Sequence, residues 1–205
     1  LFISGLARSG STALLQALDQ TDKFGSLRYK YMPFILSPKL ANFYSEKLAR
    51  NKNDEIERLH GDGLKISPNS PECLDEPYWI NAIYKTLNNT EFLKPHKLKI
   101  SDIKVYCKLL DTYLKIEKKK QFLIKNNNNH LRILSLASNL PNSNFLILFR
   151  NPIAHAKSLL NLHKKFIEIQ NKDKFILDYM NLIGHWEFGN GKKSFVYAKG
   201  QFEIL

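Results

Sequence analysis

The stretch GLARSGST at residues 5–12 has the residue types and the spacing of a phosphate-binding loop. It lies between an apolar run and a stretch with helical spacing, and glycines five residues apart let a backbone wrap around an anion. The amides at a helix N-terminus would then point at that anion, where the helix dipole also favours negative charge. The loop residues that would contact the anion are Arg8, Ser9, Gly10, Ser11 and Thr12.

The loop lacks the lysine of a nucleotide-hydrolysing Walker A loop, because Ser11 stands at that position. That lysine contacts the β- and γ-phosphates during hydrolysis, so its absence argues against a nucleoside triphosphatase. The pattern also differs from G-x-G-x-x-G, which disfavours a dinucleotide-dependent oxidoreductase. A kinase-like phosphotransferase with a P-loop stays open as an alternative, although no acidic metal-binding motif follows a strand.

A second phosphate-binding pattern, RNPIAHAKS, occupies residues 150–158. Arg150 directly follows the apolar run NFLILF and so lies at the carboxyl end of an expected strand. Pro152 suits the first turn of a helix, and Ser158 follows two turns later. A forked guanidinium and a hydroxyl can hold one phosphate together, so Arg150 and Ser158 are predicted to bind a phosphate group.

The elements that would position these motifs alternate between strand and helix. We expect strands at 1–5, 121–125 and 144–149, the last of them an unbroken apolar run typical of a buried strand. We expect helices at 13–18, 39–59, 71–87, 102–120, 128–139, 152–170 and 173–186. This order predicts an α/β fold, a three-layer sandwich around a central parallel sheet, with a helical insertion over about 33–120 and a site at the carboxyl ends of the strands.

Length and composition describe one globular domain with a surplus of positive charge. The chain has 205 residues, of which 43% are hydrophobic and 24% charged, and these fractions argue against disorder. Its 31 Lys and Arg against 19 Asp and Glu give a net charge of +12, which points to an anionic partner. A basic nucleic-acid-binding module is one alternative, but no such motif is present and aromatic residues do not alternate with basic ones, so we expect no nucleic-acid partner.

The remaining composition limits the compartment and the boundaries of the domain. Cys73 and Cys107 are too few for a disulfide framework and wrongly spaced for zinc. No apolar run approaches the length of a membrane span and no signal peptide is present, so we expect a cytoplasmic location. The chain opens at Leu1 in its first expected strand and ends abruptly at Leu205, so we expect a single domain trimmed at both ends.

Taken together, the two phosphate-binding patterns resemble those of the PAPS-dependent sulfotransferases. GLARSGST resembles the loop that binds the 5′-phosphosulfate in this family, and FLILFRNPIAHAKS resembles the family's 3′-phosphate motif. The resemblance covers roughly residues 1–190. Further segments are similar to a bacterial-type branch of the superfamily, namely SLRYKYMPFILSP, HGDG, SPECLDEPYW and FLIKNNNNHLRI.

This resemblance implies a P-loop-like fold and a sulfuryl transfer. The donor would be 3′-phosphoadenosine 5′-phosphosulfate (PAPS), and the acceptor a hydroxyl or amine of a carbohydrate or small molecule. The reaction would release 3′,5′-adenosine bisphosphate and would need no metal. A sulfotransferase-like fragment that keeps the cofactor loops but has lost activity is a further alternative.

The resemblance also implies roles for individual residues. Residues 9–12 would cradle the 5′-phosphosulfate, and Arg8 would neutralise charge on the leaving phosphate. Arg150 and Ser158 would bind the 3′-phosphate, which distinguishes PAPS from ATP. Lys125, at the end of QFLIK, resembles a family lysine beside the transferred sulfuryl group, with a strand-end surface lysine as the alternative.

The general base stays open, because family members carry a glutamate or a histidine at positions that hold other residues here. Asn127, for example, stands two residues after Lys125, where some members have histidine. His60 in HGDG has a suitable ordinary pKa, and a turn histidine bonded to backbone is its alternative. Glu76 precedes Pro77 and an aromatic pair, where an apolar pocket could raise its pKa, and an exposed helix acid is its alternative. The other candidates are Asp62 and Glu72.

Two more predictions concern charged residues outside these motifs. Arg28 could bind an acidic acceptor. The other histidines, His185 among them, show no metal-ligand spacing and are predicted to be structural or at the surface.

Overall fold

A parallel sheet forms the centre of the computed structural model, which describes residues 1–48, 55–61, 63–72, 74–83 and 92–196. β1 (Phe2–Ser4) pairs with β7 (Ile124–Lys125) on one side and with β8 (Phe145–Ile147) on the other. β2 (Phe24–Gly25) pairs with β6 (Gln121–Phe122), which precedes β7 by one residue. All of these pairs are parallel, so the predicted α/β fold with a central parallel sheet is confirmed.

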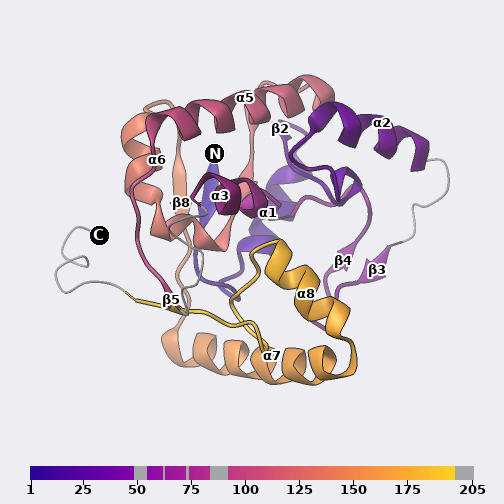
Figure 1. Cartoon of the computed structure of the whole chain (residues 1–205), viewed down its shortest axis with the longest axis vertical. Helices are drawn as coiled ribbons and strands as arrows, with labels where there is room; N and C mark the ends of the chain where they lie inside the picture. Colours follow the sequence, from indigo (N-terminus) through magenta and orange to yellow (C-terminus); the bar gives the residue numbers. More distant parts are fainter. Residues whose placement is uncertain (49–54, 62, 73, 84–91, 197–205) are drawn as a thin grey trace.

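Helices surround the strands, and Figure 1 shows two of them, α5 and α7, along opposite sides of the molecule. The α-helices described are α1 (Ser11–Asp19), α2 (Pro38–Leu48), α3 (Glu76–Ala82), α5 (Ile100–Glu117), α6 (Ile133–Asn139), α7 (Pro152–Lys172) and α8 (Lys174–Leu182). Short 3₁₀ helices are η1 (Tyr29–Tyr31) and η2 (Asn127–Leu131). Two small strand pairs complete the fold: β3 (Ile56–Glu57) with β4 (Lys65–Ile66), and β5 (Phe92–Leu93) with β9 (Ser194–Phe195).

The helix predicted over 39–59 is wrong at its end. α2 stops at Leu48, residues 49–54 lie outside the described part of the chain, and Ile56 and Glu57 form β3. The HGDG turn folds the chain back, so Ile56 pairs with Ile66 and Glu57 with Lys65 in an antiparallel hairpin. These apolar and opposite-charge pairs favour strands, and the helical spacing of apolar residues could not reveal them.

Three further helices are shorter than predicted, and one of them is α8, which ends at Leu182 and not at residue 186. The helix expected over 71–87 begins at Glu76, because Pro71 forms a bridge to Arg28 instead, and residues 84–87 lie outside the described part. The helix expected over 128–139 is divided into η2 and α6. The side chain of Asn126 accepts a hydrogen bond from the amide of Asn128. This bond caps the 3₁₀ turn η2, which precedes α6.

The strand predicted over 144–149 exists as β8, but its predicted burial is wrong. Leu146 and Ile147 are 40% and 42% exposed, and Phe149 is 88% exposed. β8 lies at one edge of the sheet as far as the described residues show, whereas β1, which is no more apolar, lies between two strands and is buried. Position in the sheet, not composition, therefore decides which apolar strand is covered.

The core contains a cluster of charged residues at the start of α3. Asp75 and Glu76 are buried, and the side chain of Arg132 is fully buried. Arg132 donates from Nη1 to Glu76 Oε1 at 3.3 Å and also from Nη2 to Glu76 Oε2. Asn126 Nδ2 donates to Asp75 Oδ1 at 2.8 Å and to Glu76 Oε2 at 2.7 Å. Asn126 thus bonds both adjacent buried carboxylates, while Arg132 pairs with Glu76.

Aromatic side chains close this charged cluster. The hydroxyl of Tyr106 and Nε1 of Trp79 donate to Asp75 Oδ2 at 2.7 and 3.1 Å. The guanidinium of Arg132 lies over the ring of Trp79, 4.9 Å from its centre. Because the cluster joins α3, η2 and α5, it holds together elements from distant parts of the sequence.

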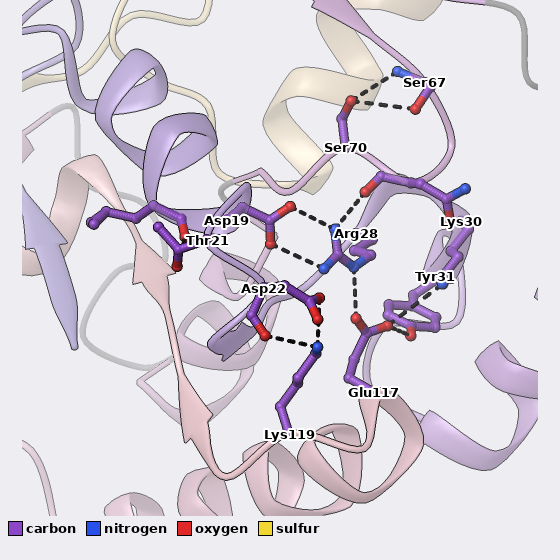
Figure 2. Close-up of polar contacts among 12 residues, drawn as sticks. Asp19, Thr21, Asp22, Arg28, Lys30, Tyr31, Ser67, Ser70, Glu117 and Lys119 are labelled. Atoms are coloured by element: carbon purple, nitrogen blue, oxygen red, sulfur yellow. Dashed lines mark hydrogen bonds and ion pairs between the residues drawn. The ribbon is translucent and has the colours of Figure 1, made fainter.

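Arg28 is the centre of a second polar network, shown in Figure 2. Its Nη1 and Nη2 donate to the two carboxylate oxygens of Asp19 at 2.9 and 3.0 Å, and its Nε donates to Glu117 Oε2 at 2.7 Å. Tyr31 donates to the other oxygen of Glu117. Asp19 and Glu117 end α1 and α5, so the guanidinium ties two helix C-termini to η1. This is a structural role, and it differs from the acceptor-binding role considered for Arg28.

We expect Glu117→Gln to destabilise the protein at neutral pH and to matter less in acid. Burial raises the pKa of Glu117, but hydrogen bonds from Tyr31 and Arg28 outweigh burial, and the pKa lies below its ordinary value of 4.5. A carboxyl with a depressed pKa contributes stability above its unfolded pKa and loses that contribution as the pH falls through the folded pKa. Urea unfolding should therefore show a deficit of about 1–3 kcal/mol at neutral pH that shrinks near pH 3.

The control for this prediction is Glu168→Gln on the exposed surface of α7. It should leave the free energy of unfolding unchanged at both pH values. A deficit in Glu117→Gln that is equally large in acid would contradict the assigned depression of the Glu117 pKa.

Candidate active site

The predicted phosphate loop joins β1 to α1 through a tight turn. Gly5 has a φ of 150°, and a Cβ there would lie 2.9 Å from Ser9 Oγ and 3.0 Å from the Leu148 carbonyl oxygen. Gly10 has a φ of 96° and directly precedes α1, where no side chain caps the helix. Both positions therefore require glycine, and the loop presents the N-terminus of α1 to a ligand.

The two predicted phosphate motifs are in direct contact. Arg8 Nε donates to Ser158 Oγ at 3.0 Å, and Arg150 Nη1 donates to the carbonyl oxygen of Arg8 at 3.0 Å. His155 Nε2 donates to the carbonyl oxygen of Ala7 at 2.7 Å. The start of α7 is thus fixed against the loop, and it brings together residues about 150 positions apart, as two parallel strands with neighbouring carboxyl ends require.

A cavity of about 440 Å³ lies beside this junction. Its wall includes charged and polar side chains from segments far apart in the sequence, namely Arg8, Thr12, Arg58, Glu72, Lys125 and Arg150. Residues of the β3–β4 hairpin and of α8 form much of the remaining wall, and Figure 1 shows these two elements near α1. The cavity therefore gathers both phosphate motifs and Lys125 at the carboxyl ends of β1, β7 and β8.

Ion pairs connect Lys125 to the phosphate loop. Lys125 Nζ lies 3.1 Å from Glu72 Oε1, and Arg58 Nη1 lies 3.6 Å from Glu72 Oε2. Arg58 Nη1 also donates to Thr12 Oγ1 at 3.3 Å. Sequence reasoning missed Arg58, although its place two residues before His60 in the hairpin turn could have indicated it. Two cations, Arg58 and Lys125, thus flank the single carboxylate of Glu72. The net positive charge of this group suits the binding of an anion.

The acid–base candidates are separated by the structure. His60 lines the cavity, and its ring packs against Phe166 and Phe188 with centroids 5.5 and 5.6 Å away. Glu72 also lines the cavity. Glu76 is not among the described cavity-lining residues and is held in the core by Arg132. Asp62 lies outside the described residues.

His185, which the sequence predicted to be structural or at the surface, forms another part of the wall. His185 lines the cavity, and its Nδ1 lies 3.4 Å from Glu187 Oε2. Asn127, which also lines the cavity, donates from Nδ2 to Glu187 Oε1 at 2.8 Å. The segment HWE at 185–187, which follows α8 after Ile183 and Gly184, is the one sequence feature that could have suggested this pair.

The Glu187 carboxylate and the protonated form of His185 stabilise each other. Burial lowers the pKa of His185, but the adjacent carboxylate outweighs burial and the pKa lies above its ordinary value. Burial raises the pKa of Glu187, but the His185 charge and hydrogen bonds from His185 and Asn127 bring it down to about 2. Glu187 is therefore ionised at neutral pH and fixes the imidazole of His185 in the cavity wall.

Metal-binding clusters and membrane-spanning helices are both missing from the described part of the chain. No group of three His, Cys, Asp or Glu side chains within it could hold a metal ion. None of the helices described there is both long and apolar enough to cross a membrane.

Comparison with known proteins gives a family match and a structural match. A family model described as "Sulfotransferase family" matches residues 1–190. No curated protein matches the chain. The solved structure of sulfotransferase STF1 from Mycobacterium tuberculosis H37Rv (type1 form) is similar with a TM-score of 0.46 and 14% sequence identity. The similarity covers 96% of this chain but 61% of the mycobacterial chain, so this chain spans less than two thirds of that protein.

Proposed function

This chain belongs to the sulfotransferase family, and on that basis we propose that it transfers a sulfuryl group from PAPS to a hydroxyl or amine acceptor. The reaction releases 3′,5′-adenosine bisphosphate. The observation that carries the proposal is the direct contact of the two phosphate motifs at the cavity, through Arg8, Ser158 and Arg150. Two phosphate sites on neighbouring strand ends match a nucleotide with phosphates at both its 5′ and 3′ positions.

The residues present fit such a donor. Residues 9–12 hold the 5′-phosphosulfate in this proposal, through backbone amides and hydroxyls at the N-terminus of α1. Arg150 and Ser158 hold the 3′-phosphate. Ser158 accepts a hydrogen bond from Arg8, and a hydroxyl that accepts can still donate its own hydrogen, here to a phosphate oxygen. The donor supplies the activated sulfuryl group.

Charge stabilisation is assigned to the cations of the cavity. The acceptor oxygen or nitrogen forms a bond to sulfur while the bond from sulfur to the 5′-phosphate oxygen breaks, and the electron pair stays on that phosphate. Arg8 and Lys125 balance the charge that develops there, as cations do in phosphoryl transfer. Lys125 donates to Glu72 Oε1 at 3.1 Å, and this contact anchors its ammonium group at the cavity wall.

We assign the general base to His185, with Glu187 and Asn127 as positioning residues. The Nε2 of His185 accepts the acceptor's proton, and Glu187 stabilises the imidazolium that forms. Glu187 is in turn held by Asn127, which the sequence places two residues after Lys125. The catalytic role of His60 stays a prediction, and Glu76 is left with its structural pairing to Arg132.

The first test is selective stabilisation by the bisphosphate product. At about 100 times its Kd, 3′,5′-adenosine bisphosphate should add about 2.7 kcal/mol of stability. For a chain of this size that is a rise of about 5–10 °C in Tm, measured by thermal shift. Arg150→Ala should remove most of this rise because the 3′-phosphate loses its guanidinium partner.

Comparison ligands decide between this proposal and the alternatives. ATP with Mg²⁺ should give a smaller rise than the bisphosphate, since ATP has no 3′-phosphate. A larger rise with ATP and Mg²⁺ would favour a kinase-like phosphotransferase. An equal rise with any polyanion such as heparin would indicate a general basic surface. A bisphosphate effect that is indifferent to Arg150 would overturn the assigned site.

A further inference from the structure

Part of the cavity wall is apolar, and α8 together with Ile183, the residue after it, supplies one stretch of that wall. Ile176, Tyr179, Met180 and Ile183 all line the cavity. Their spacing of three, four and seven residues places them along a single face of a helix. Leu182 of the same helix does not line the cavity as described, and it is 71% exposed. The face of α8 toward the cavity is therefore a continuous apolar surface.

The β3–β4 hairpin extends this apolar wall. Leu59, Leu64 and Ile66 line the cavity from the hairpin. The rings of Phe166 and Phe188 line it as well, and they pack against each other with centroids 4.7 Å apart. A molecule in this part of the cavity would meet mostly hydrocarbon side chains, with the Tyr179 hydroxyl and the His60 ring as polar groups among them.

The charged part of the cavity restricts the reacting group of the acceptor. Four basic side chains, those of Arg8, Arg58, Lys125 and Arg150, line the cavity together with one carboxylate, that of Glu72. An alkyl amine is protonated at neutral pH, so these cations would repel it. A hydroxyl is uncharged and can donate its hydrogen to a neutral base. The charges therefore favour an oxygen acceptor over an amine.

The apolar wall restricts the body of the acceptor. A sugar carries a hydroxyl on almost every carbon, and each hydroxyl removed from water without a partner costs free energy. The apolar face of α8 offers few such partners. A hydrocarbon body gains free energy by leaving water for the same surface.

We propose that the acceptor of this sulfuryl transfer is an alcohol or phenol with an apolar body, and that α8 and the β3–β4 hairpin bind that body. This inference rests on the proposed function and narrows it. A carbohydrate would place its hydroxyls against the apolar wall, and a protonated amine would be repelled by the cations.

Three compounds with the same six-membered carbon ring test the proposal. Cyclohexanol carries one hydroxyl, myo-inositol carries a hydroxyl on every carbon, and cyclohexylamine carries one protonated amine. With PAPS as donor, kcat/KM for cyclohexanol should exceed the values for both others by about 100-fold or more. Without any turnover, cyclohexanol should raise the Tm of the complex with 3′,5′-adenosine bisphosphate, and the other two should not.

Variants on α8 connect this preference to the apolar wall. Ile176→Asp should raise KM for cyclohexanol about tenfold or more and leave the bisphosphate-induced rise in Tm unchanged. Leu182→Asp, on the same helix but outside the described cavity wall, is the matched control and should change neither. If Ile176→Asp does not fold, Ile176→Thr makes the same comparison with a smaller, polar side chain that keeps the β-branch of isoleucine.

The outcomes separate the two proposals. No rise in Tm with the bisphosphate would overturn the sulfotransferase function itself. A normal bisphosphate effect with myo-inositol or cyclohexylamine preferred over cyclohexanol would overturn the acceptor class alone. Equal effects of the Ile176 and Leu182 variants would show that α8 does not bind the acceptor.

Discussion

Replacing His185 with asparagine should lower kcat for sulfuryl transfer by about 10²–10⁴-fold, the usual contribution of a positioned general base. The asparagine side chain can still form hydrogen bonds, but its amide is not basic and cannot take up the proton of the acceptor hydroxyl. The affinity for 3′,5′-adenosine bisphosphate should stay unchanged, because the nucleotide contacts are assigned to the loop and to α7. His96→Asn, which alters a histidine outside the described cavity wall, is the control. A loss of activity no greater than in this control would remove His185 from the mechanism.

Glu187→Gln distinguishes a base that is held in position from a histidine that merely packs there. The carboxylate raises the pKa of His185, so its removal should lower that pKa. Because the base must be neutral to accept a proton, the acid limb of the kcat/KM profile should move to lower pH in this variant. Activity should fall less than in His185→Asn. An acid limb that does not move would show that His185 does not titrate in the reaction.

Replacing Arg132 with methionine should lower the free energy of unfolding by about 3–5 kcal/mol, the cost of breaking a buried ion pair from one side. The change leaves Glu76 buried without its ion-pair partner and Asp75 buried without its nearby positive charge. Burial already raises the pKa of Asp75, and loss of the Arg132 charge should raise it further. Urea unfolding at neutral pH measures the effect.

A compensating variant tests the cause of this loss. Arg132→Met combined with Asp75→Asn and Glu76→Gln removes both carboxylate charges and should recover part of the lost stability. Lys108→Met, on the exposed side of α5, should change the free energy of unfolding by less than about 0.5 kcal/mol. A deficit in Arg132→Met as small as in Lys108→Met would contradict the assigned role of the buried pair.

The phosphate loop and the Arg150 motif were predictable because each is defined by a few adjacent residues. Gly5 and Gly10 fix the turn, and Arg150 follows an apolar strand directly. The sequence also predicted a site at the carboxyl ends of parallel strands, and the structure adds the direct contact of the two motifs across about 150 residues. Local sequence thus identified the part of the site that depends on strand order alone.

Other parts of the site depend on partners that no local pattern reveals. Glu76 has the aromatic neighbours expected of a buried acid, but its partner Arg132 comes from a segment 56 residues away. His185 is placed in the cavity wall beside Glu187, which is held by Asn127 from 60 residues away. The β3–β4 hairpin was missed because the apolar spacing before it also fits a helix. In each case the fold, and not the adjacent residues, decides the role.

The placement of the cavity walls on separate elements has a consequence for how this protein can diverge. The residues that we assign to donor binding belong to the β1–α1 loop and the start of α7, whereas much of the apolar wall belongs to α8 and the β3–β4 hairpin. Substitutions on one face of α8 would change which molecules are accepted while the nucleotide site and the sheet stay intact. The architecture therefore allows the preferred acceptor to change during evolution while the residues assigned to the donor are kept.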